Sequence, residues 1–310
     1  MSEIKRITVE DFCRMFNCQA DELPEWFISK LDRINTNYRE VNIDEFKEYV
    51  LQVLKRIAAP YITRSRDENL EAFEKGWREN LELLISGSVA SDSLKPKYFR
   101  PSKFLRYNKE LIISETIDIE YDLFTVARYL IFARYLSPYE NIYEIGCGSC
   151  QNILMLSDMF PSKSLFGLDW TTASTEIAAE LAKSLHRDIH GLTFDMLNPP
   201  DDFKIKEGSA IITIHALEQI GSGHKKLISF LRESKPTLVI HYEPILEFYD
   251  EDNLLDYLAL IYSQKRNYLS GFYTELKILK EQGQIEILEA RRPNLGGVIH
   301  EASLIIWRPI

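Results

Sequence analysis

Residues 144–150 read Glu-Ile-Gly-Cys-Gly-Ser-Cys. Residues 141–143 before them predict the end of a short buried strand, and residues 151–160 after them predict a helix. Gly146 and Gly148 can take a positive φ and let a ligand approach the backbone closely. The helix start supplies unpaired N–H groups and Glu144 supplies an acceptor. The stretch therefore predicts a nucleotide-binding turn, although the third glycine of a GxGxxG pattern is missing.

The chain after residue 121 alternates between predicted helices and strands. Strands are predicted at about 141–145, 164–169, 190–195, 209–214 and 236–242, and helices at about 121–135, 151–160, 171–185 and 223–233. Residues 284–291 and 303–307 predict two strands that pair as an antiparallel hairpin. We expect an α/β fold with a Rossmann-like, doubly wound, mostly parallel seven-stranded sheet ending in that hairpin. Residues 1–120 are expected to form a helical N-terminal extension or lid, and 121–310 the ligand-binding domain.

Composition restricts the class of protein. The 310 residues carry a formal net charge of −10, which argues against a general nucleic-acid binder. No run of 18 apolar residues occurs, so no membrane span is expected. Four cysteines do not suggest a disulfide framework, and a cytoplasmic location is the simplest inference. Cys147 and Cys150 have the spacing of a redox pair or half a zinc site, but small side chains are also what the turn needs. A homodimer remains an expected state.

Acidic residues follow the second and third predicted strands, where ligands of parallel sheets bind. Asp169 lies 25 positions after Glu144, near the distance at which a carboxylate meets ribose hydroxyls, and Trp170 could stack on adenine. The alternative is that Asp169 merely caps the following helix. Asp195 could accept from an adenine amino group and Met196 could pack on the ring, or the two could form a polar turn.

Two histidines and two carboxylates are expected at the ends of the fourth and fifth strands. They are His215, Glu218, His241 and Glu243. A lone histidine is more often structural than catalytic, but this convergence favours a catalytic site. A metal held by His241, Glu243 and Glu218 is an alternative, but the sequence spells no complete metal motif, so no metal site is predicted.

Residues 96–109 are basic and aromatic within an acidic protein. One interpretation is a solvated loop. The other is a wall over a polar substrate, in which Tyr98, Arg100, Arg106 and Tyr107 contact that substrate.

Together these motifs resemble the class I S-adenosylmethionine-dependent methyltransferases. The matching stretches are Glu144-Ile-Gly-Cys-Gly-Ser, Gly167-Leu-Asp169, Asp195-Met196 and His215-Ala-Leu-Glu218, and the resemblance covers roughly residues 121–310. It implies S-adenosylmethionine as cofactor. The implied cofactor-binding residues are Glu144, Gly146, Cys147, Gly148, Asn152, Asp169, Trp170, Asp195, Met196, His215 and Ala216. A looser similarity, which includes Phe73-Glu-Lys-Gly-Trp77 and Trp307-Arg-Pro, is to bacterial sugar O-methyltransferases.

The resemblance implies methyl transfer to a hydroxyl of a small molecule or sugar. Such a hydroxyl must lose a proton, and His215 is the first candidate for the base because its family position faces the methyl. His241 is the second candidate, and Glu218 or Glu243 would orient or replace either one. The alternatives are an N-methyltransferase on an amine or amino sugar, a tRNA or rRNA methyltransferase, and a non-catalytic methyltransferase-like interaction module.

Overall fold

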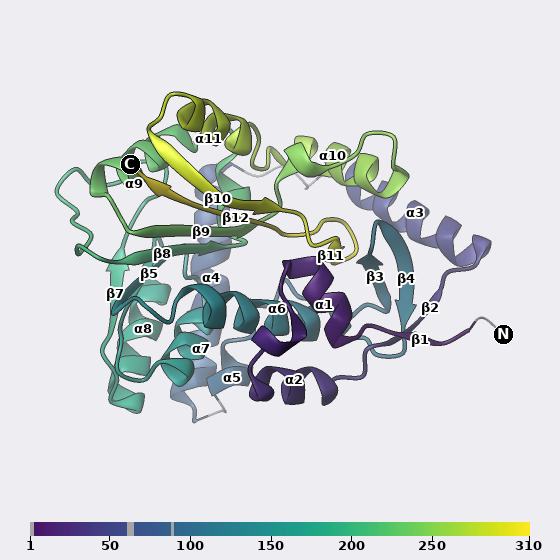
Figure 1. The fold of residues 1–310 in the computed structure, drawn as a ribbon, viewed down its shortest axis with the longest axis horizontal. Coiled ribbons are helices and arrows are strands. Elements are labelled where there is room, and N and C mark those ends of the chain that lie inside the picture. Colours follow the sequence, from purple (N-terminus) through teal and green to yellow (C-terminus); the bar gives the residue numbers. More distant parts are fainter. Residues whose placement is uncertain (1–2, 61–64, 88–89) are drawn as a thin grey trace.

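A seven-stranded sheet forms the centre of the protein. The structure is a computed structural model that describes residues 3–60, 65–87 and 90–310 (Figure 1). The strands of this main sheet are β5 (Asn141–Ile145), β6 (Ser164–Asp169), β7 (Ile189–Thr193), β8 (Ala210–Ile214), β9 (Leu238–Glu243), β10 (Ile285–Arg291) and β12 (Ser303–Pro309). Their order across the sheet is β10-β12-β9-β8-β5-β6-β7. Strands β5 to β9 pair in parallel, and β12 is antiparallel to β9 and β10. The expected fold class is confirmed.

Helices cover both faces of the main sheet. The α-helices of the described ranges are α1 (Val9–Phe16), α2 (Glu25–Asp32), α3 (Ile43–Ala58), α4 (Arg66–Ile85), α5 (Ala90–Ser93), α6 (Ile119–Tyr135), α7 (Gln151–Met159), α8 (Thr172–Leu185), α9 (Lys225–Ser234), α10 (Leu254–Arg266) and α11 (Phe272–Glu281). Helices α6, α7 and α8 pack on one face, and α9 and α11 pack on the other. No helix of the described ranges has the length and apolar character needed to cross a membrane.

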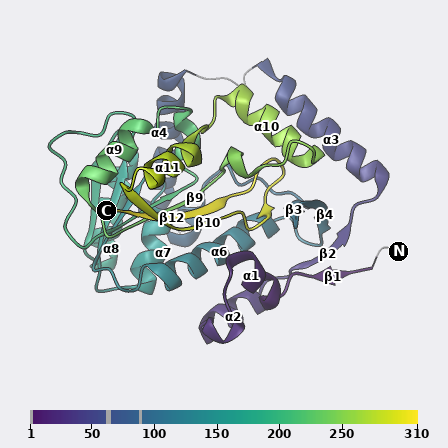
Figure 2. The same cartoon turned by 45° about the horizontal axis from the view of Figure 1, so that its top comes forward.

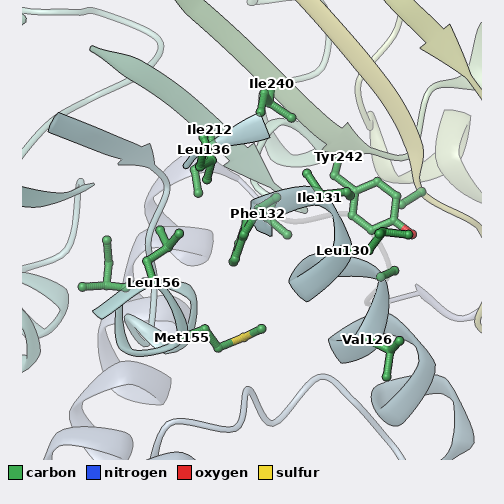
Figure 3. Close-up of a cluster of buried hydrophobic side chains, with 14 of the residues drawn as sticks. Val126, Leu130, Ile131, Phe132, Leu136, Met155, Leu156, Ile212, Ile240 and Tyr242 are labelled. Carbon is green, nitrogen blue, oxygen red and sulfur yellow. The ribbon is translucent and has the colours of Figure 1, made fainter. Parts of the chain in front are cut away.

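Side chains of the central strands alternate between two buried clusters. Ile142 and Ile212 pack with α6, α7 and α8 on one face, whereas Ile145 and Ile211 pack with α9 and α11 on the other. This alternation follows from the two-residue repeat of a strand, and it explains why both faces of β5 and β8 are buried, from Ile142 to Ile145 and from Ala210 to Ile214. Figure 3 shows part of the first cluster, where Phe132 of α6 and Leu156 of α7 lie under the sheet.

A second, smaller sheet lies at the opposite end of the molecule from β7 (Figures 1 and 2). Its order is β1-β2-β4-β3-β11. The bounds are β1 (Lys5–Arg6), β2 (Asn37–Glu40), β3 (Phe104–Tyr107), β4 (Glu110–Ser114) and β11 (Leu295–Gly296). The N-terminal extension is therefore not purely helical. It also pairs with a strand from the connection between β10 and β12, so the small sheet contains residues from both sides of residue 120.

Buried ion pairs join the small sheet to α10. Arg106 of β3 is fully buried, and its guanidinium contacts Asp256 of α10 and, at 3.0 Å, Glu301. Arg292 contacts the same two carboxylates at 2.6 and 2.8 Å. Two cations and two anions thus neutralise one another, as buried charges require.

Helix α4 packs along α8 and covers the turn that follows β5. Glu74 accepts hydrogen bonds from the N–H groups of Thr172 and Ala173 at 2.8 and 3.1 Å, which satisfies donors at the start of α8. Arg78 bridges Glu74 and Glu176. Glu74 therefore caps α8, because the Thr171 side chain makes no hydrogen bond to the N–H groups of the first turn.

Candidate functional site

A cavity of about 810 Å³ opens at the carboxyl ends of β5, β6 and β8. Its size is typical of a small-molecule site. The sheet contributes its floor, including Glu144, Asp169 and His215, while Trp77 and His300 come from the N-terminal extension and the C-terminal hairpin. The site is therefore assembled from segments far apart in sequence.

The turn after β5 has the geometry expected of a ligand-binding turn. Gly146 has a φ of +78°, and a Cβ at this position would lie 2.4 Å from the Cβ of Ala216. Gly148 has a φ of +51°, and a Cβ there would lie 2.9 Å from the Trp77 ring. Both positions thus require glycine for backbone conformation and for close packing.

Asp169, at the end of β6, holds this turn in place. Its Oδ2 accepts from the Gly148 N–H at 3.0 Å, and its Oδ1 accepts from the Thr171 N–H and hydroxyl at 2.9 and 2.7 Å. The capping interpretation of Asp169 therefore holds in part, because its carboxylate does bond to the residue before α8. The same carboxylate also lines the cavity, beside Trp170.

Glu144 and Arg128 form the two ends of a buried polar chain. Arg128 donates to Asn152 Oδ1 at 2.6 Å, and Asn152 donates to Glu144 Oε1 at 2.6 Å. Burial raises the pKa of Glu144 to about 8. Among the described residues, Glu144 Oε2 and Arg128 Nε have no hydrogen-bond partner, although both residues line the cavity. Buried polar atoms are usually paired, so these two mark a place for a polar ligand.

Asp195 and Met196 line the cavity after β7. Asp195 accepts from the Leu197 N–H and the Asn198 side chain, each at 3.0 Å. It also pairs with Arg66, the first residue of α4, whose guanidinium lies 5.5 Å from the centre of the Trp170 ring. Arg66 thus lies across the two side chains predicted to meet adenine.

A histidine–carboxylate–histidine cluster lies at the end of β8. His215 Nδ1 is 3.9 Å from Glu218 Oε2, and His300 Nε2 is 3.6 Å from the same oxygen. Burial lowers the pKa of His215 to about 3 and that of His300 to about 4, so both rings are neutral. Burial raises the pKa of Glu218 to about 7. His215 also has a φ of 51°, an uncommon conformation for a residue other than glycine.

The structure corrects the expectations for His241 and Glu243. His241 lies inside β9 and is fully buried, with Nδ1 2.8 Å from the Thr213 hydroxyl and Nε2 accepting from Trp307 at 2.9 Å. Glu243 is also fully buried and accepts from the Ala216 N–H at 3.0 Å. Neither lines the cavity. Glu243 therefore positions the His215 loop, and the alternative metal set of His241, Glu243 and Glu218 is not brought together.

The basic segment divides between the two interpretations. Tyr98 and Arg100 line the cavity, and their contact with a substrate stays a prediction. Arg106 and Tyr107 do not, which corrects the prediction for both. Arg106 belongs to the buried ion pairs described above, and the Tyr107 ring packs edge-on against Tyr38 at 5.6 Å between centroids.

All residues predicted to bind the cofactor line the cavity. They are Glu144, Gly146, Cys147, Gly148, Asn152, Asp169, Trp170, Asp195, Met196, His215 and Ala216. Arg66, Arg128 and His300 were missed. A signal existed for Arg128, a charged residue among apolar ones in the middle of α6, and for His300, because the β10–β12 connection begins at the end of the sheet where β9 ends.

No protein-family model matches the chain, and no curated protein sequence matches it. Solved structures do match it. A protein from Pyrococcus horikoshii OT3 is 15% identical, with a TM-score of 0.46, over 66% of this chain and 95% of that one. The plantazolicin methyltransferase BpumL, in complex with a pentazolic desmethylPZN analog and SAH, is 14% identical, with a TM-score of 0.42, over 78% and 98%. Human N-acetylserotonin methyltransferase, in complex with SAM, is 14% identical, with a TM-score of 0.40, over 59% and 54%.

The fold itself is decided by the main sheet. The spatial order of the five parallel strands reverses at β5, with β6 and β7 on one side of it and β8 and β9 on the other. One antiparallel strand, β12, lies between β9 and β10. A closing antiparallel hairpin distinguishes this sheet from NAD-binding sheets, whose last strand is parallel. By the order and direction of its strands, the chain has the fold of the class I S-adenosylmethionine-dependent methyltransferases.

Proposed function

We propose that the protein is an S-adenosylmethionine-dependent methyltransferase that methylates a hydroxyl group of a small molecule. The observation that carries the proposal is the buried Arg128–Asn152–Glu144 chain beside the glycine turn. It offers a carboxylate and a guanidinium, each with one unpaired atom among the described residues. The methionine end of the cofactor carries an ammonium and a carboxylate, which complement these two groups.

The rest of the cofactor would follow the edge of the sheet. A carboxylate has about four lone-pair sites. Oδ1 of Asp169 already accepts two hydrogen bonds and Oδ2 accepts one, so Oδ2 is the oxygen available to a ribose hydroxyl. Trp170 offers a ring to the adenine face, and Asp195 an acceptor for its amino group.

Methyl transfer then takes place near His215. The methyl group leaves the sulfonium and bonds to the acceptor oxygen, which requires alignment and the loss of the hydroxyl proton. His215 is neutral, and its Nε2 has no hydrogen-bond partner in the described structure, so we assign it to the reactive end. The Phe124 ring packs edge-on against the imidazole at 4.8 Å and fixes its orientation.

Calorimetry with S-adenosylmethionine and S-adenosylhomocysteine tests the cofactor. The wild-type protein is expected to bind one equivalent. Glu144→Gln and Arg128→Met should each weaken binding at least about tenfold, since each removes a charge-assisted hydrogen bond. Glu286→Gln, an exposed carboxylate on β10, is the matched control and should bind normally. Absence of binding by the wild-type protein would refute the proposal.

Turnover tests the assignment of His215. His215→Ala should lower the rate of S-adenosylhomocysteine formation with hydroxylated acceptors by about 10² while cofactor affinity is retained. Near-normal turnover in this variant would remove His215 from the reaction. An amine acceptor needs less help from a base, so tolerance of His215→Ala with amines would favour N-methylation.

A further inference from the structure

The carboxylate of Glu218 lies between two imidazoles without bonding to either. The distances from its Oε2 to His215 Nδ1 and His300 Nε2, 3.9 and 3.6 Å, are too long for hydrogen bonds. Oε2 is buried and has no hydrogen-bond partner in the part of the chain that the structure describes, while Oε1 accepts from Gln219 at 2.9 Å. An unpaired buried carboxylate oxygen is costly, and a cation between the three side chains would satisfy it.

The spacing of the three side chains suits one metal ion. Two ligand atoms that each lie about 2.1 Å from an ion can be at most about 4.2 Å apart. The His215–Glu218 and His300–Glu218 distances both fall below this limit. One ligand atom from each residue lies within 4.8 Å of the other two, so a movement of less than about 1 Å completes the site.

Each of the three residues is held by contacts with a different segment of the chain. His215 follows β8, and its N–H donates to the Tyr242 carbonyl at 3.1 Å. The Glu218 carbonyl accepts from the Leu269 N–H at 3.1 Å. His300 lies in the β10–β12 connection, with the Tyr262 and Tyr268 rings within 6.3 Å of its own. The unusual positive φ of His215 is the kind of strain that is retained at functional sites.

We propose that His215, Glu218 and His300 bind a divalent transition-metal ion in the cavity wall. Two imidazole nitrogens and one carboxylate oxygen suit ions such as Zn²⁺, whereas Mg²⁺ and Ca²⁺ prefer oxygen ligands alone. Three protein ligands leave coordination positions open, as in catalytic rather than structural sites. Because all three residues line the cavity, these positions face the space left for the acceptor.

The role of the ion rests on the proposed methyl transfer, although its binding does not. An acceptor hydroxyl bound to the ion has a lower pKa, so its proton passes to solvent more readily. The oxygen then accepts the methyl group as the bond from sulfur to that methyl breaks. In this state His215 is a metal ligand, and the ion takes over the activation that a free imidazole would otherwise supply.

The test uses the full-length protein after treatment with a chelator. Calorimetric titration with Zn²⁺ alone is expected to show one equivalent bound, and Mg²⁺ alone should not bind. Glu218→Gln and His300→Ala should each weaken Zn²⁺ binding by about 10² or more, by comparison with the losses that follow removal of groups supporting a metal site. His190→Ala, which breaks a surface histidine–aspartate pair, is the matched control. Cys150→Ser should also bind normally, and loss there would assign the ion to Cys147 and Cys150, whose sulfurs lie 3.7 Å apart.

Calorimetry with S-adenosylhomocysteine on the same samples separates this proposal from the previous one. Glu218→Gln and His300→Ala should bind S-adenosylhomocysteine as the wild type does, which also shows that they are folded. Absence of stoichiometric Zn²⁺ binding, or binding that survives both substitutions, would overturn the metal site and leave the methyltransferase proposal intact. Zn²⁺ binding without any S-adenosylhomocysteine binding would refute the methyltransferase proposal and support the metal site.

Discussion

Arg66 Nη2 lies 2.5 Å from Asp195 Oδ2, so the first residue of α4 is ion-paired with the residue proposed to meet adenine. The same guanidinium lies over the Trp170 ring. The N-terminal extension therefore contacts the cavity wall at Asp195 and Trp170 in addition to covering the glycine turn through Trp77.

Removal of this contact should change the rates of cofactor exchange. The ion pair must open before an adenine amino group reaches Oδ2, and a partly exposed pair contributes at most about 1 kcal/mol. We expect Arg66→Ala to raise both the association and dissociation rate constants for S-adenosylhomocysteine, by up to about fivefold, in stopped-flow fluorescence. Arg39→Ala, which breaks a pair with Glu45 outside the cavity, is the control. Unchanged rates would show that the Arg66 contact does not restrict access.

Gly146 should be far less tolerant of alanine than a glycine with free space around it. Gly146→Ala combines a strained positive φ with an overlap at Ala216. Gly208 has a similar φ of +74° but nothing within 4 Å of an added Cβ. In urea unfolding we expect Gly208→Ala to cost about 1 kcal/mol and Gly146→Ala a further 1–3 kcal/mol or so. Equal losses in the two variants would contradict the close packing of the turn on Ala216.

Glu144 should make the free energy of unfolding depend on pH. Its pKa is raised from 4.5 to about 8 in the folded protein, so between these values the folded state binds more protons than the unfolded state. Stability must then fall as pH rises, by at most about 1.4 kcal/mol per pH unit from this group. Glu144→Gln removes this loss. In urea titrations, the free energy of unfolding of this variant relative to the wild type should therefore increase as the pH rises from 5 to about 8.

An opposite shift provides the control for that experiment. Hydrogen bonds from Arg39 and the Asn42 backbone lower the pKa of Glu45 to about 2. Its contribution is therefore complete above pH 4.5 and is lost only in acid, so Glu45→Gln should differ from the wild type by a constant amount from pH 5 to about 8. A Glu144→Gln curve parallel to the wild-type curve would contradict the raised pKa of Glu144.

The Arg106 ion pairs should stabilise the folded protein and should not affect substrate binding. Arg106→Met leaves Asp256 and Glu301 with a single cation, Arg292, and should cost about 3–5 kcal/mol in unfolding experiments. Lys5→Met, at an exposed pair with Glu40, should leave stability unchanged. A stable Arg106→Met protein with weakened substrate binding would instead restore the role first predicted for Arg106.

The part of the cavity around the glycine turn could be predicted because its residues are local in sequence. Strand, turn and helix are contiguous around Gly146, and Asp169 follows the next strand, so spacing alone places them. Arg106 was misassigned because its partner Asp256 is 150 positions away, and charge in a sequence does not reveal a distant partner. His241 was misassigned because Thr213 of β8 and Trp307 of β12 occupy its two ring nitrogens, and the sequence does not reveal partners on neighbouring strands. Arg66 could not be predicted, since its position depends on how α4 packs.

The pairing of β11 with β3 has a consequence for the order in which the protein forms during synthesis. Strand β3 has β4 on one side early in the chain, but its other edge stays open until residues 295–296 have been made. By then the ribosome has translated β1 to β10, and His300 and β12 follow directly. An open strand edge invites wrong pairing, so the nascent small sheet is the part of this protein expected to depend most on protection by chaperones.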